Sequence, residues 1–166
     1  SNLLRAFNAL NWLVEKSNTF QPGKKLVANE FFYFDLKTRK KPTQFDIDFI
    51  APDKIRYQFS LKINQEKILK EELFFFPKKE KGRNTRSRLY TREDGKPIKF
   101  GDQFTGQKKS IEEEVLPNQL FLSVAVNKNH QQLIPVFLSH GEETWLVDIC
   151  GTQSNDRPVP GYLFYC

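Results

Sequence analysis

The sequence lacks several features that would place it in a familiar class of protein. It has 166 residues, no methionine, two cysteines and two histidines. Two cysteines do not make a disulfide framework, and so low a number is compatible with a reducing compartment. No apolar run approaches the roughly 18 residues of a membrane span, and the amino end lacks the layout of a signal peptide. We therefore expect a cytoplasmic protein that does not associate with a membrane.

The common catalytic motifs are also missing. There is no Gly-x-Ser-x-Gly nucleophile elbow, no Cys-x-x-Cys pair and no His-Glu-x-x-His zinc motif. The pair Gly23 and Lys24 does not end a phosphate-binding loop, because Asn18 stands where the first glycine should be and Lys25 where a hydroxyl should be. The chain alone therefore offers no motif that assigns a reaction.

Aromatic and basic residues are abundant. The chain has 16 phenylalanines, and 26 lysines and arginines against 20 acidic residues give a net charge of +6. Aromatic side chains in such numbers can fill a core, which excludes a disordered chain. The basic residues concentrate in segments 37–41 and 78–88.

The second basic segment is a candidate nucleic-acid patch. It is polar and contains Gly82 and Asn84, so we predict a loop or a flexible hairpin arm. Cations in such an arm can contact the phosphates of nucleic acid, although an ordinary solvated loop has the same composition. The patch comprises Lys78, Lys79, Lys81, Arg83, Arg86 and Arg88.

Hydrophobic periodicity predicts the secondary structure. Residues 2–16 carry apolar side chains at steps of three and four, which indicates an amphipathic α-helix. Apolar and polar residues then alternate in 44–49 and 55–63, which predicts two antiparallel strands joined by a turn at 51–53. Further strands are predicted at 67–76, 89–91, 98–100 and 144–150, and a short helix at 110–115. The apolar run 120–126 fits either a buried strand or the start of a helix.

These elements predict the α+β fold class, with one amino-terminal amphipathic helix and a mostly antiparallel sheet of about five to seven strands. The residue pattern of the sequence changes near Pro135, after which residues typical of turns dominate. We therefore divide the chain into residues 1–133 and a divergent or unrelated segment, 134–166.

Five stretches together resemble a known family. They are SNLLRAF (1–7), KPTQFDIDFI (41–50), IRYQF (55–59), EELFFFPK (71–78) and LPNQLFLSV (116–124). This spaced pattern resembles the amino-terminal part of prokaryotic AAA/ABC-like P-loop ATPases of the SMC-like and overcoming-lysogenization-defect (OLD) kind, often described as AAA-domain or abortive-infection ATPases. The resemblance covers residues 1–132 and implies a partial ATPase head that contains a helix and an antiparallel β-subdomain.

The resemblance implies roles for three residues. In that family the phosphate loop ends in Gly-Lys-Ser-Asn-Leu-Leu and runs directly into the first helix. Ser1 then matches the hydroxyl residue that ligates Mg²⁺, and Ser1 and Asn2 would contact the nucleotide. Asn127 stands where the family has a glutamine that senses the γ-phosphate. The absence of methionine fits a chain that begins just after the Walker A lysine, inside a longer reading frame, although Ser1 and Asn2 also match the remnant of a cleaved purification tag.

The resemblance further implies a parent protein that binds ATP and Mg²⁺ and hydrolyses ATP in phage defence or nucleic-acid transactions, as a homodimer joined through its heads. Because most of Walker A, the signature motif and Walker B are missing, we expect no cofactor and no activity for this chain alone. One alternative is a stand-alone β-rich module that contacts nucleic acid or an acidic partner through its basic loops. The other is a purely structural segment.

Overall fold

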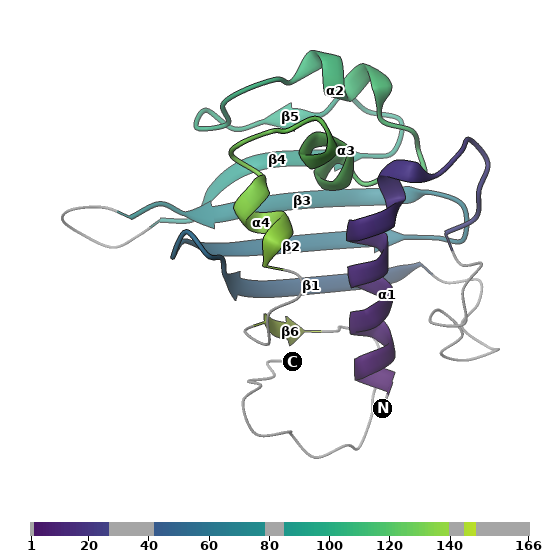
Figure 1. Ribbon diagram of the computed structural model, residues 1–166, viewed down its shortest axis with the longest axis horizontal. Helices are drawn as coiled ribbons and strands as arrows, with labels where there is room; N and C mark the ends of the chain where they lie inside the picture. The colour runs from purple at the N-terminus through teal and green to yellow at the C-terminus, as the bar shows by residue number, and fades with distance from the viewer. Residues whose placement is uncertain (1, 27–41, 79–84, 140–144, 149–166) are drawn as a thin grey trace.

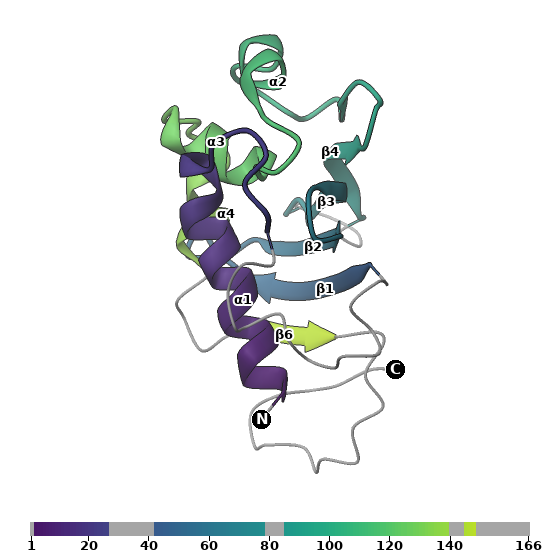
Figure 2. The ribbon, with the colours of Figure 1, turned by 90° about the vertical axis from the view of Figure 1, so that its right-hand side faces the viewer.

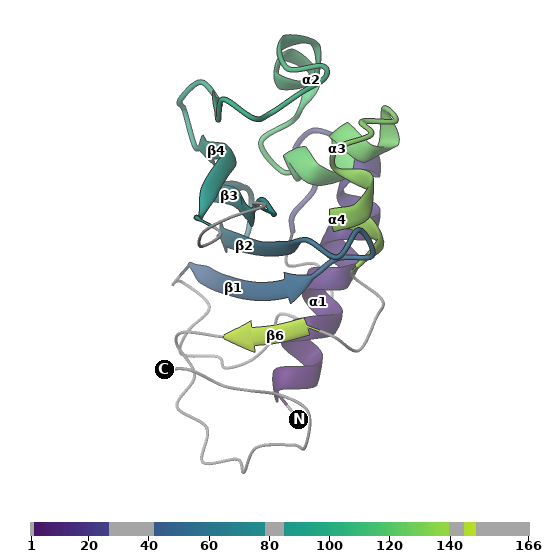
Figure 3. The same ribbon diagram turned by 90° about the vertical axis from the view of Figure 1, so that its left-hand side faces the viewer.

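The computed structural model describes residues 2–26, 42–78, 85–139 and 145–148. They form an antiparallel sheet of six strands in the order β5-β4-β3-β2-β1-β6, with helices packed against one face (Figure 1). Edge-on views place α1, α3 and α4 on the same side of the sheet (Figures 2 and 3). The described residues place no helix on the other side. The predicted α+β class and mostly antiparallel sheet are therefore confirmed.

Helix α1 (Asn2–Lys16) confirms the first predicted element. Its side chains Ala6, Ala9, Leu10, Leu13 and Val14 are buried, and their three- and four-residue spacing places them on the face that meets the core. A short 3-10 helix, η1 (Ser17–Thr19), follows directly. The amino end of α1 lies at the β6 edge of the sheet (Figures 1 and 2).

The strands follow the alternating pattern of the sequence. They are β1 (Thr43–Ile50), β2 (Arg56–Ile63), β3 (Ile68–Phe76), β4 (Ser87–Glu93), β5 (Lys99–Phe100) and β6 (Trp145–Asp148). In β1, Phe45, Ile47 and Phe49 are buried, whereas Asp46 and Asp48 face the side without helices. The turn from β1 to β2 closes through a hydrogen bond from the Ala51 amide to the Ile55 carbonyl, 3.0 Å long.

Two predicted segments take a more definite form in the structure. The apolar run 120–126 becomes helix α3 (Phe121–Asn127), in which Phe121 to Ala125 are all buried. A helix that is covered on every side has no amphipathic pattern, which explains why periodicity left this run undecided. The predicted loop 78–88 ends earlier than expected, because Ser87 and Arg88 already belong to β4 and pair with Phe75 and Phe74.

The remaining helices are α2 (Lys109–Glu114), which confirms the predicted short helix, and α4 (Ile134–Leu138), which no sequence pattern predicted. Val136 of α4 belongs to the main core cluster, and β6 pairs with β1. Both elements lie beyond the predicted division at 133/134, which stays a prediction.

Candidate functional site

The predicted nucleotide-contacting residues begin at the amino end of α1. Ser1 lies outside the described residues, and Asn2 is the first residue of the helix. Helix α1 is firmly placed, because Leu10 and Leu13 in its second half are 1% and 0% exposed. The direction of α1 is therefore set by the core.

Asn127, the predicted sensor of the γ-phosphate, is the exposed last residue of α3. The hydroxyl of Ser123 in α3 accepts a hydrogen bond from the Asn18 amide, 3.1 Å long, so α3 lies against the carboxyl end of α1. Asn2 lies at the opposite end of this 15-residue helix, about 20 Å away at 1.5 Å per residue. The structure does not bring Asn2 and Asn127 together, and both roles stay predictions.

The predicted nucleic-acid patch is only partly visible. Lys79, Lys81 and Arg83 lie outside the described residues, while Lys78, Arg86 and Arg88 are exposed. Arg86 stacks over the ring of Phe74, with its guanidinium carbon 3.6 Å from the ring centroid. One cation of the segment therefore lies over an aromatic ring that comes from β3.

Strand pairing adds residues that the linear sequence did not single out. Ile50 of β1 pairs with Arg56 of β2, which pairs in turn with Phe76 of β3. The three side chains form a row across the face of the sheet that carries no described helix. The alternation within each strand indicates which face each of these side chains occupies. That the three side chains are neighbours follows only from the register between the strands.

Arg56 is held from two directions. Its Nε donates to Oδ1 of Asp48 at 2.7 Å, and its Nη2 donates to Oδ2 of the same carboxylate. Its guanidinium also lies over the ring of Phe76, 4.4 Å from the centroid. Such a bidentate pair fixes the plane of the guanidinium.

The charges of this pair are stabilised by each other. Partial burial alone would raise the pKa of the Asp48 carboxyl, but hydrogen bonds from Arg56 and Gln58 outweigh it and hold that pKa below its ordinary value. The hydrogen bond to Asp48 likewise raises the pKa of Arg56. Both groups are therefore charged near neutral pH.

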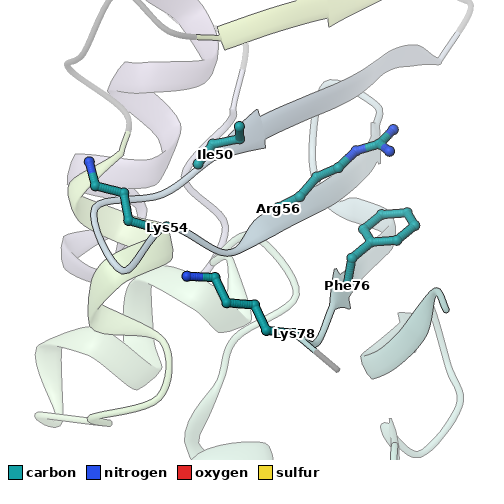
Figure 4. A pocket seen from close by; sticks show the side chains of 5 residues that line it. All are labelled: Ile50, Lys54, Arg56, Phe76 and Lys78. Carbon is teal, nitrogen blue, oxygen red and sulfur yellow. The ribbon is translucent and has the colours of Figure 1, made fainter. Parts of the chain in front are cut away.

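Arg56 is one of five residues that line a pocket of about 230 Å³ between the β1–β2 turn and the end of β3 (Figure 4). Its lining consists of Ile50, Lys54, Arg56, Phe76 and Lys78. The amino groups of Lys54 and Lys78 extend to one side, and Arg56 and Phe76 lie together on the other (Figure 4). No acidic side chain lines this pocket. Because Asp48 already pairs with Arg56, Lys54 and Lys78 supply its net positive charge, which suits an anion with a planar or apolar part.

A buried polar network attaches α3 to the opposite face of the sheet. Glu71 of β3 is 0% exposed, and its carboxylate accepts hydrogen bonds from the Tyr90 hydroxyl at 2.8 Å and from the amides of Phe121 and Leu122 at 2.8 and 3.0 Å. Burial and the nearby Glu71 carboxylate raise the pKa of the Tyr90 hydroxyl well above its ordinary value. Nη1 of Arg92 lies 3.6 Å from Oε2 of Glu71, and Nη2 of Arg92 donates a hydrogen bond to the Leu116 carbonyl. The network is consistent with a structural role.

His130 is a second buried polar group. It is 6% exposed, its ring centroid lies 5.0 Å from that of Phe104, and neither ring nitrogen has a hydrogen-bond partner among the described residues. Burial lowers the pKa of His130, an effect that nearby backbone groups of Thr105 and Gln107 offset only in part. The ring is therefore neutral at pH 7.

This environment predicts that stability depends on pH. The unfolded chain binds a proton at His130 near its ordinary pKa of about 6.5, whereas the folded chain binds it only at lower pH. The free energy of unfolding should therefore fall as the pH decreases from about 7.5 to about 5.5, and His130→Gln should reduce that fall. Urea titrations of both proteins at the two pH values measure it, and equal falls would contradict the assignment.

The described residues contain no group of three or more histidine, cysteine, aspartate or glutamate side chains that could hold a metal ion. Among the helices of the described ranges, none has the length and apolar character needed to cross a membrane.

Comparison with known proteins gives one match. No curated protein and no solved structure matches the chain. A family model described as "AAA domain, putative AbiEii toxin, Type IV TA system" matches residues 1–142. This range includes α1, the first five strands and α2 to α4. The chain therefore belongs to this AAA-domain family, as the spaced sequence motifs predicted.

Proposed function

We propose that the chain is part of an ATPase head and that the protein which carries it binds and hydrolyses ATP with Mg²⁺. The observation that carries this proposal is the family match over residues 1–142. The fixed orientation of α1 supports it, because a helix that begins at a phosphate loop must be held rigidly to position phosphate groups.

Within this proposal, Ser1 supplies a hydroxyl to Mg²⁺, Asn2 contacts the nucleotide, and Asn127 belongs to the sensing segment. No Gly-x-x-x-x-Gly-Lys-Ser/Thr motif occurs within the 166 residues. Backbone amides of such a loop cradle the phosphates, and its lysine neutralises their charge. ATP binding therefore depends on residues outside these 166. We extend the proposal to a cytoplasmic homodimer that acts in phage defence.

The isolated 166 residues should not bind Mg-ATP with micromolar affinity, because they lack the phosphate loop. Calorimetric titration with Mg-ATP should give no saturable heat in the micromolar range and no hydrolysis. A dissociation constant in the low micromolar range would contradict the proposal, since it would mean that the chain holds a complete nucleotide site of its own.

A second candidate function is contact with nucleic acid. The observation that favours it is the set of exposed cations at one end of the sheet, which includes Lys54, Lys78, Arg86 and Arg88. Phosphate contacts by lysine and arginine release counterions, so binding of this kind weakens steeply with salt. Arg86 covers Phe74 and Arg88 pairs with it, so these two cations lie on the face without described helices. Lys54 and Lys78 extend to the other side, at the ends of β1 and β3 (Figure 4).

A further inference from the structure

We propose that the pocket between the β1–β2 turn and the end of β3 binds one nucleotide unit of a single-stranded nucleic acid. In this arrangement the guanidinium of Arg56 is the surface on which the base stacks, and Lys54 and Lys78 contact the flanking phosphates. This inference rests on the second candidate function, contact with nucleic acid.

The charges of the pocket favour a phosphate-bearing ligand. Within the described part of the chain, Lys54 and Lys78 have no ion-pair partner, and neither is covered, since both side chains are exposed. Lys54 stands at the turn with a positive φ of 63°, and Lys78 is the second residue after the end of β3. Two free ammonium groups at the rim of one pocket provide point charges for two phosphates.

Arg56 provides a preorganised stacking surface. Asp48 holds the guanidinium through two hydrogen bonds, and the Phe76 ring supports it from one side at 4.4 Å. The Arg56 side chain nevertheless remains 52% exposed, and we infer that the planar side opposite Phe76 is the one that a base reaches. Bases stack on guanidinium planes as they do on aromatic rings, and a plane that is already fixed loses little entropy when a base binds.

The size of the pocket suits one base. Pockets for drug-sized ligands measure about 300–1,000 Å³. This pocket, at about 230 Å³, is slightly smaller. Ile50, which is 56% exposed, adds an apolar wall. An acidic peptide would satisfy the lysines, but only a peptide that also carries an aromatic side chain would stack on Arg56.

A second stack on the same face distinguishes a single strand from a duplex. Arg86 covers Phe74 at 3.6 Å, and Phe74 lies two residues before Phe76 in β3. The bases of a duplex are already paired and stacked on one another, so only an unpaired strand has bases that are free to stack on Arg56 and Arg86.

The test is a fluorescence-anisotropy titration with a short labelled oligothymidylate and with a matched duplex, at low and physiological salt. Arg56→Lys keeps the charge and removes the planar stacking surface. It should weaken single-strand binding about tenfold, because base stacking contributes strongly to such affinity, and leave duplex binding unchanged. Phe76→Leu, which removes the support beneath Arg56, should weaken single-strand binding in the same direction.

Charge variants separate this inference from the function on which it rests. The double variant Lys54→Ala/Lys78→Ala should weaken single-strand binding. It should also make the negative slope of log K against log salt shallower by about 1.4, roughly 0.7 per lost phosphate contact. Lys62→Ala is the matched control, because Lys62 is exposed at the other end of β2, and it should change neither quantity.

Each outcome decides one of the two proposals. If the native chain binds neither oligonucleotide, or if the double variant binds as well as the native chain, contact of this surface with nucleic acid is wrong. If the double variant weakens binding and Arg56→Lys does not, only the stacking pocket is wrong. If an equal concentration of a free nucleoside monophosphate displaces the oligonucleotide, the ligand of the pocket is a free nucleotide, and the proposal of a single-stranded nucleic acid is wrong.

Discussion

Replacing Glu71 with glutamine is expected to lower the free energy of unfolding by about 3 kcal/mol. Glu71 is fully buried, and its carboxylate accepts three hydrogen bonds from groups that have no access to water. In the variant, the two carboxylate oxygens that accept the three hydrogen bonds are replaced by an amide group, in which only one oxygen can accept. It also removes the negative charge beside Arg92, whose side chain is only 11% exposed.

The size of this effect follows from what the substitution leaves behind. Removing one partner of a buried ion pair costs about 3–5 kcal/mol, because the remaining charge and donors stay desolvated without compensation. Replacing both partners would cost less. The amides of Phe121 and Leu122 belong to the amino end of α3, so the same change should loosen that helix on the sheet.

Glu72→Gln provides a matched control. Glu72 is the next residue in β3 and faces the other side of the sheet, where it contacts Lys70 at 2.8 Å and Thr91 at 3.2 Å. Its side chain is partly exposed, and exposed pairs of this kind contribute about 0–1 kcal/mol. Urea denaturation of both variants measures the difference. Equal losses at the two positions would contradict the structural role of Glu71.

The elements that the sequence predicted are those whose pattern is local. The alternation of Phe45, Ile47 and Phe49 with polar residues predicts β1 because one face of that strand is buried and the other is not. The apolar stripe of α1 is equally local. Both predictions need only neighbouring residues, so they were made without knowledge of the rest of the chain.

Features that depend on distant pairing could not be predicted. Glu71 caps α3 across 50 residues of sequence, and no local pattern indicates that a strand carboxylate will accept from the amides of a later helix. The same holds for the pocket. Lys78 was identified from the charge of its own segment, whereas Lys54 and Arg56 join it only through the register of β1, β2 and β3.

Asn127 illustrates a different difficulty. The sequence resemblance gave it a role beside the nucleotide, but position along a family pattern does not fix position in space. Helix α3 is tied to the carboxyl end of α1 by Ser123 and to β3 by Glu71. Its last residue therefore lies far from Asn2, and its role in the family pattern stays a prediction.

Replacing Ser1 with alanine is expected to have the largest effect on activity. In the proposed ATPase, the Ser1 hydroxyl ligates Mg²⁺, which neutralises charge that develops on the transferred phosphoryl group. Loss of one such contact in the transition state lowers turnover by about a hundredfold. Asn8→Ala is the control, because Asn8 is exposed on helix α1 and has no proposed role.

The most direct test of the central claim is Mg²⁺-dependent ATP turnover by the protein that carries this segment, measured for the native sequence, Ser1→Ala and Asn8→Ala. We predict turnover by the native protein, a loss of about a hundredfold in Ser1→Ala and no change in Asn8→Ala. Absence of turnover in the native protein, or equal turnover by the two variants, would contradict the assignment of this chain to a working ATPase head.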